Sequence, residues 1–164
     1  MNCCEAKIEE KAAPESSLQL CSACGRRGQK VRLLTLRHLL RGERQKDIRD
    51  AHYYFCASPD CDAVYFSKET NQLFTQKDVR VRIGIKDKTE PVTICYCFGF
   101  TEQMMRDEIL ALGYTAIPEL IKAEINAGHC ACEIKNPSGR CCLGEVNTSV
   151  KRIEAQLQAS QADA

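Results

Sequence analysis

The sequence predicts an α+β chain built from two small modules rather than one large domain. Three observations support this prediction: twelve cysteines that fall in pairs, short strand-like apolar runs before residue 90, and helical apolar spacing after residue 94. Small modules that bind metal do not depend on a large core. We expect a flexible tail over residues 1–19, a small metal-bound mixed α/β module with short strands over 20–90, a small helical module over 91–158 and a second flexible tail over 159–164.

The composition indicates a cytoplasmic protein without membrane insertion. The first residues carry charges where a signal peptide needs an unbroken apolar run, and no apolar segment long enough to span a bilayer occurs. In a reducing compartment, clustered thiols are more often metal ligands or redox groups than structural bridges. The formal net charge of +1 gives no electrostatic reason to expect nucleic acid as a partner.

The first module opens with a cysteine knuckle and continues as short strands. In Cys21-Ser-Ala-Cys24-Gly25 the intervening residues turn the chain so that both sulfurs face one point, and the glycine takes a conformation that other residues resist. A second knuckle, Cys56-Ala-Ser-Pro-Asp-Cys61, contains a Ser-Pro-Asp turn. We expect strands at 31–36, 53–55, 63–66, 72–75 and 79–85, the last with a basic face, and a short charged helix at 37–50.

The cysteines of the two knuckles predict a structural zinc site. Their pattern is C-x2-C-x31-C-x4-C, and four thiolates from two knuckles give the closed tetrahedral shell of such a site. A redox cluster and a reversible dithiol are the alternatives. His38 and His52 have no partner at ligand spacing, so we expect neither to bind metal. The predicted zinc ligands are Cys21, Cys24, Cys56 and Cys61.

Three helices are predicted in the second module. Thr101 can cap the first helix, which ends at Gly113, and Pro118 suits the first turn of the second, which ends at Gly128. The third helix is the clearest, because its apolar residues follow a 3, 4, 3, 4 spacing that forms one continuous stripe. The stripe consists of Leu143, Val146, Val150, Ile153 and Leu157, and we expect the chain beyond it to fray.

A second group of cysteines surrounds these helices. Cys95 and Cys97 form a C-x-C pair, and such a pair followed by two helices and further cysteines resembles the pattern of one [2Fe-2S] family. The negative charge of a tetrathiolate cluster disfavours burial. Free backbone N–H groups at the helix starts near Thr101 and Leu143 can offset that charge.

Six cysteines compete for the four ligand positions of this second site. Cys95 and Cys97 are predicted ligands because no other cysteine lies near them in the sequence. We choose Cys132 and Cys142 as the others, because Cys142 abuts the third helix and the intervening Asn-Pro-Ser-Gly turn can bring Cys132 beside it. The alternates are Cys130 and Cys141, and a helical domain with buried unligated thiols is the alternative to any metal site.

Two segments resemble known families. Cys95-Tyr-Cys97-Phe-Gly-Phe-Thr101, with the helices after it, resembles the bacterioferritin-associated ferredoxin family, whose small helical fold binds one [2Fe-2S] cluster. That family closes with C-x2-C, whereas nine residues separate Cys132 from Cys142 here. Together with Tyr53-Tyr-Phe-Cys56 and Cys61-Asp-Ala-Val-Tyr-Phe66, this longer loop resembles the N-terminal region of the two-domain copper chaperones of the CopZ type.

The resemblance implies a zinc site and a [2Fe-2S] cluster in a cytosolic protein of copper handling. It implies reduction of Cu(II) to Cu(I), with Cu(I) as a further bound metal. The implied partners are a copper-transport ATPase or a separate copper-carrying domain, and a redox partner protein. The copper-carrying domain of that family has a G-M-x-C-x-x-C loop, and this sequence contains no such motif.

These observations favour one-electron transfer linked to copper handling. The alternative is a non-redox metal-sensing or protein-interaction module. The cations that would form its docking face are Arg80, Arg82, Lys86 and Lys88. A third hypothesis is soft-metal binding by Cys3 and Cys4 together with the spare thiols. Without a Gly-rich phosphate loop or a nucleophile–base pair, the sequence indicates an electron-transfer or metal-binding protein more than a classical enzyme, with metal reduction as the one enzymatic role left open.

Overall fold

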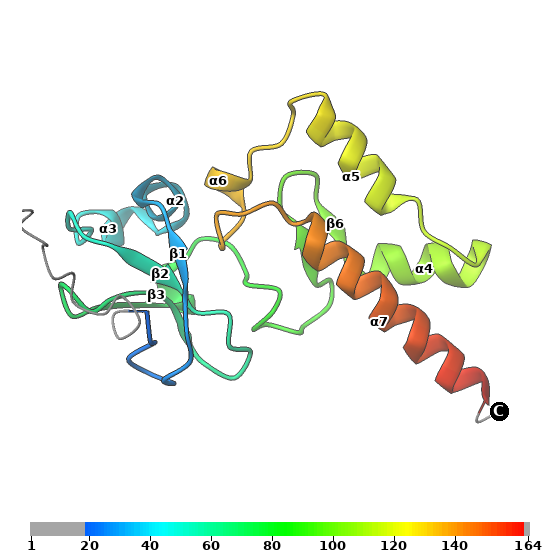
Figure 1. Cartoon of the computed structure of the whole chain (residues 1–164), viewed down its shortest axis with the longest axis horizontal. Helices are drawn as coiled ribbons and strands as arrows, with labels where there is room; N and C mark the ends of the chain where they lie inside the picture. Colours follow the sequence, from blue (N-terminus) through cyan, green and yellow to red (C-terminus); the bar gives the residue numbers. More distant parts are fainter. Residues whose placement is uncertain (1–18, 163–164) are drawn as a thin grey trace, which may run out of the picture.

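The structure, a computed structural model, describes residues 19–162, so the tail cysteines Cys3 and Cys4 lie outside it. We call residues 19–78 the sheet module and residues 93–162 the helical module, and the two lie side by side in Figure 1. The elements in chain order are β1 (Gln29–Val31), α2 (Leu33–Leu39), α3 (Gly42–Gln45), β2 (Tyr53–Phe55), β3 (Ala63–Ser67), β4 (Gln72–Thr75), the 3-10 helix η1 (Gln76–Asp78), β5 (Thr93–Cys95), β6 (Phe100–Thr101), α4 (Glu102–Leu112), α5 (Ile117–Asn126), α6 (Cys132–Lys135) and α7 (Leu143–Ala162).

The sheet module is an antiparallel sheet in the order β1-β2-β3-β4. Alternate residues of β2 point to opposite faces. Tyr53 and Phe55 join a core that includes the buried leucines of α2, whereas Tyr54 stacks on Phe66 with ring centroids 5.7 Å apart. The second face also holds three of the knuckle cysteines, Cys21, Cys56 and Cys61. Both faces of the central strands are therefore buried.

The chain after β1 is helical where the sequence predicted a strand over 31–36. The strand ends at Val31, and α2 begins at Leu33. Leu36 and Leu39 are both buried and lie three residues apart, which is the spacing that brings side chains to one face of a helix. The prediction of a strand over 31–36 is therefore wrong.

An isolated antiparallel bridge between Leu40 and Val79 corrects two further predictions. The helix predicted over 37–50 is interrupted, because Leu40 takes an extended conformation with ψ of 146° at the end of α2. In the strand predicted over 79–85, only Val79 pairs, and the chain then turns into a loop. Because that strand does not form, it presents no continuous basic face.

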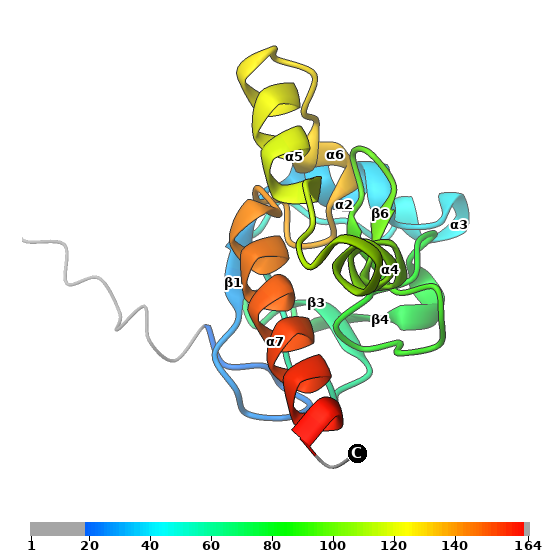
Figure 2. The same ribbon diagram turned by 90° about the vertical axis from the view of Figure 1, so that its right-hand side faces the viewer.

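The helical module packs α4 and α5 against α7 around one apolar core (Figure 2). Thr101 caps α4 by accepting a hydrogen bond from the backbone N–H of Met104 at 3.2 Å, and Gly113 ends the helix with φ of 83°, as predicted. All five apolar residues of the predicted α7 stripe contribute to the core. The short β5–β6 hairpin and α6 were not predicted, and both carry cysteines of the second group.

Helix α7 is longer than the sequence suggested. It continues past Leu157 to Ala162, although we expected the chain to fray there. Its outer turns extend away from the sheet module in Figure 1. Within residues 19–162, neither α7 nor any shorter helix combines the length and apolar character needed to cross a membrane.

Candidate metal centres

The first candidate site lies where two cysteine knuckles meet beside the sheet. Cys21 and Cys24 belong to the turn that precedes β1, in which Gly25 has a φ of 71°. Cys56 and Cys61 lie in the connection between β2 and β3. The Sγ atoms of these four cysteines lie within 4.8 Å of one another. The structure thus brings together the four residues that were predicted to bind zinc.

The distances in this site suit a single tetrahedral ion. The Sγ atoms of Cys24 and Cys56 are 3.7 Å apart. A tetrahedral zinc ion with Zn–S bonds of about 2.3 Å separates its sulfurs by roughly 3.8 Å. Cys24 is exposed, whereas the other three sulfurs belong to buried residues. The donor set fits a closed tetrathiolate centre with one ligand near solvent.

Backbone N–H groups stabilise the thiolates of this site. The N–H of Arg26 donates to the sulfur of Cys24 and is the main reason that the pKa of this thiol is lowered to about 7. Burial raises the pKa of Cys56 to about 12 and also raises the pKa of Cys61. The sulfurs of Cys56 and Cys61 nonetheless accept N–H bonds from residues two positions ahead, which favour the thiolate form. Metal binding at this site must therefore displace protons from buried thiols.

The second candidate site joins the β5–β6 hairpin to the starts of α6 and α7. Cys95 ends β5 and Cys97 lies in the hairpin turn, which the N–H of Gly99 closes by donating to the Cys95 carbonyl oxygen at 2.9 Å. Cys132 is the first residue of α6, and Cys142 directly precedes α7. Four cysteines from three separate segments of the chain therefore meet at one end of the helical module.

The sulfurs of this second group form two contacting pairs. The Sγ atoms of Cys97 and Cys132 are 3.5 Å apart. The thiol of Cys142 donates a hydrogen bond to the sulfur of Cys95. The two pairs are joined because the backbone N–H of Cys142 donates to the sulfur of Cys132. The residues predicted as cluster ligands are thus neighbours, and Cys₄ is the usual ligand set of a [2Fe-2S] cluster.

The electrostatics of the second group distinguish one thiol from its neighbours. The hydrogen bond from Cys142 lowers the pKa of Cys95 to about 6, whereas this contact and burial raise the pKa of Cys142. Burial is the main cause that raises the pKa of Cys132. Without metal, the thiolate form is thus more favoured at Cys95 than at Cys142. A cation or cluster at this site would favour the thiolate form of both.

Cys130 is a fifth sulfur at this site. Its Sγ atom lies 3.7 Å from that of Cys132, and these two sulfurs lie within 4.8 Å of that of Cys97. Cys141, the other alternate, is exposed. The repeated C-x-C spacing of Cys95/Cys97 and Cys130/Cys132 is the sequence signal for this fifth thiol.

Sequence reasoning missed three side chains that connect the candidate sites to their surroundings. Tyr65 lies in β3 shortly after Cys61, Tyr96 lies between Cys95 and Cys97, and Lys86 lies in the connection between the modules. Only Tyr96 could have been suspected from the sequence, because of its place in the C-x-C motif. The other two act through contacts over more than 20 residues of chain.

Comparisons with known proteins identify relatives of this chain. A family described as "Zinc binding domain" matches residues 18–80. The X-ray structure of the Archaeoglobus fulgidus CopZ N-terminal domain is similar, with a TM-score of 0.65 and 27% sequence identity over 78% of this chain and 95% of that one. The copper chaperone CopZ of Archaeoglobus fulgidus is 31% identical over 148 residues, which cover 84% of this chain and 69% of the relative. The chain therefore belongs to the family of the copper chaperone CopZ.

Proposed function

We propose that this protein is a cytoplasmic electron-transfer protein of copper handling that carries zinc and a [2Fe-2S] cluster and reduces Cu(II) to Cu(I). The observation that supports it most directly is the presence of two cysteine groups of different geometry. Cys21, Cys24, Cys56 and Cys61 form a closed set sized for one ion. The second group offers paired sulfurs beside the start of α7, where backbone N–H groups favour a negative charge.

In this proposal each module has its own metal. Zn²⁺ is held by the first cysteine group and stabilises the sheet module, whose core is small. The cluster is held by Cys95, Cys97, Cys132 and Cys142 in a helical module of the bacterioferritin-associated-ferredoxin type. When bound, a [2Fe-2S] cluster supplies one-electron transfer. One electron from the reduced cluster would convert one Cu(II) to Cu(I), and a redox partner protein would then supply the next electron to the oxidised cluster.

Copper is the substrate in this scheme rather than a resident cofactor. Soft thiolate ligands favour Cu(I), so Cu(I) has to pass to a thiol-rich acceptor. We propose a copper-transport ATPase or a separate copper-carrying domain as that acceptor, in keeping with the relative's name of copper chaperone.

A test must separate the electron stored in the cluster from reduction of copper by free thiols. The full chain is reduced anaerobically with dithionite, freed of excess reductant and mixed with Cu(II) in the presence of a Cu(I)-specific chelator. We expect about one Cu(I) per reduced cluster beyond the yield of the oxidised protein, which contains the same thiols. Equal yields from the reduced and oxidised forms contradict the proposed reaction.

One observation favours a second candidate function, a non-redox metal-sensing or interaction module. The sulfurs of Cys97, Cys130 and Cys132 lie within 4.8 Å of one another and could hold a single soft ion instead of a cluster. In that case the protein binds metal at both sites but never iron. Metal analysis of anaerobically purified protein distinguishes the two functions.

A further inference from the structure

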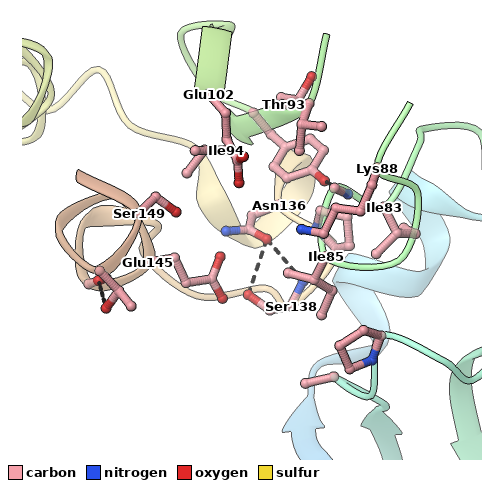
Figure 3. Close-up of a pocket in the computed structure, with 18 of the residues that line it drawn as sticks. Ile83, Ile85, Lys88, Thr93, Ile94, Glu102, Asn136, Ser138, Glu145 and Ser149 are labelled. Atoms are coloured by element: carbon pink, nitrogen blue, oxygen red, sulfur yellow. Dashed lines mark hydrogen bonds between the residues drawn. The ribbon is translucent and has the colours of Figure 1, made fainter. Parts of the chain in front are cut away.

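The loop between Cys132 and Cys142 is held largely by the sheet module. Tyr65 in β3 is fully buried, and its hydroxyl donates to the carbonyl oxygen of Pro137 at 2.7 Å. On either side of that carbonyl, Asn136 is 3% exposed and Ser138 is 4% exposed. The Asn136 Oδ1 atom accepts hydrogen bonds from the N–H and the hydroxyl of Ser138, both at 3.1 Å (Figure 3). The middle of the loop is thus ordered and docked.

The same loop approaches the sheet module too closely for a side chain at Gly139. Its φ is 67°, and a Cβ atom there would lie 2.9 Å from Oγ1 of Thr35 and 3.3 Å from Cγ2 of Val31. On the exposed side, Arg32 pairs with Glu133 of α6. The loop that carries Cys132 and Cys142 therefore lies against β1 and α2.

The other half of the second cysteine site has its own tether. The hydroxyl of Tyr96, which lies between Cys95 and Cys97, donates to the carbonyl oxygen of Arg82 at 3.0 Å and accepts from the N–H of Gly84 at 2.9 Å. Arg82 and Gly84 belong to the connecting loop, which joins the two modules. Nζ of Lys86 in this loop donates to two carbonyl oxygens of the second cysteine knuckle. The C-x-C turn is thus connected to the knuckle through a short chain of contacts.

A cavity of about 520 Å³ separates the modules between these tethers. Figure 3 shows Ile83, Ile85 and Lys88 of the connecting loop on one side and Ile94 and Glu145 of the helical module on the other. Side chains that face a cavity lack packing partners across it. The coupling between the modules must therefore come from the contacts around the cavity, which include the hydrogen bonds of the two tyrosine hydroxyls.

We propose that Tyr65 and Tyr96 are positioning residues of the second cysteine site, each fixing one half of it to the zinc-binding sheet module. Tyr65 sets the loop of Cys132 and Cys142, and Tyr96 sets the turn of Cys95 and Cys97. This inference rests on the proposed function for the identity of the cluster ligands. Zinc would hold the second knuckle in place, and β3, which carries Tyr65, starts directly after that knuckle. The geometry of the cluster site therefore depends on zinc binding as well.

The test measures thiol accessibility in the zinc-loaded, iron-free full chain. Tyr65→Phe, Tyr96→Phe and the wild type are treated with N-ethylmaleimide, and alkylation of each cysteine is followed by mass spectrometry. Tyr53→Phe is the matched control: Tyr53 is also buried, and its hydroxyl bonds only within the sheet module, to the N–H of Arg49 at 3.1 Å and to Gln72.

We expect Tyr65→Phe to speed alkylation of Cys132 and Cys142, and Tyr96→Phe to speed that of Cys95 and Cys97, each on the order of tenfold. Tyr53→Phe should leave all four rates unchanged, and removal of zinc should speed all four. Unchanged rates in both tether variants, or equal acceleration in the control, overturn the proposal. After iron reconstitution, the tether variants should also alter the visible circular dichroism of the cluster. A chain that takes up no iron refutes the proposed function, while the alkylation rates still decide the tethers.

Discussion

Lys86 of the connecting loop is bonded to Cys61 of the zinc site: Nζ of Lys86 donates to the carbonyl oxygen of Cys61 at 2.8 Å and also to that of Ser58 at 2.6 Å. The ammonium group thus lies beside the second knuckle, where its charge also lowers the pKa of Cys56 against the larger effect of burial. A zinc tetrathiolate carries a net negative charge, so a cation bonded to its knuckle stabilises the loaded site.

Replacement of this lysine should weaken zinc binding. Lys86→Met keeps the apolar stem but loses the charge and both hydrogen bonds. We expect zinc affinity to fall about tenfold or more, as for other partners of metal ligands. Competition with a chromophoric chelator measures it. Lys88→Met, an exposed lysine nearby, is the control and should bind zinc as the wild type does; equal affinities for both variants contradict the assigned role.

A side chain at position 28 should destabilise the folded protein. A Cβ atom there would lie 2.6 Å from Cζ of Phe66 and 2.9 Å from Cβ of Tyr54, beside the first cysteine group. We expect Gly28→Ala to lower the free energy of unfolding by about 1–3 kcal/mol, because the stacked rings must move. Urea denaturation of the zinc-loaded protein measures it. Gly42→Ala, which meets nothing within 4 Å, should be nearly neutral, and a similar loss in both variants speaks against the steric account.

The ligand set of the second site can be resolved one cysteine at a time. We expect Cys132→Ser and Cys142→Ser to lose most of the bound iron, and Cys130→Ser and Cys141→Ser to retain it. Iron and acid-labile sulfide per chain, measured after anaerobic purification, give the answer. Loss of iron in Cys130→Ser with retention in Cys132→Ser would show that the chain uses its fifth sulfur instead.

The connecting loop should loosen in acid. The guanidinium of Arg82 donates to Asp87 at 2.7 Å and holds the pKa of that carboxyl well below its usual value of about 4. A depressed pKa means that the interaction contributes fully above the ordinary pKa and is lost as pH falls toward the lowered one. At pH 6 we expect the Thr89 amide, which donates to Asp87, to be more protected from hydrogen exchange in the wild type than in Asp87→Asn, and this difference to shrink as pH falls below about 4. A difference that stays constant from pH 6 into this acid range contradicts the assignment.

The elements that could be predicted from sequence are those with local causes. The stripe from Leu143 to Leu157 forms one face of α7, and the Thr101 cap and the Gly113 stop lie where α4 begins and ends. The failures have distant causes. Leu40 leaves its helix to pair with Val79, a contact over 39 positions that no local pattern encodes.

In the candidate sites, too, the features with local causes could be predicted and those with distant causes could not. Knuckle spacing was enough to predict that the four cysteines of the first group gather, because each knuckle is a local turn. The spacing could not rank Cys130 against Cys132, because both sulfurs reach Cys97. The bond from Tyr65 to Pro137 could not be predicted, since it depends on how two distinct hydrophobic cores dock.

The central claim is that one chain holds zinc in the first cysteine group and a [2Fe-2S] cluster in the second. Metal analysis combined with EPR of the dithionite-reduced protein, purified anaerobically, tests it most directly. The account predicts about one zinc and about two irons per chain, and a signal from a spin-one-half centre that appears on reduction. Zinc without iron, in aerobic and anaerobic preparations alike, contradicts it.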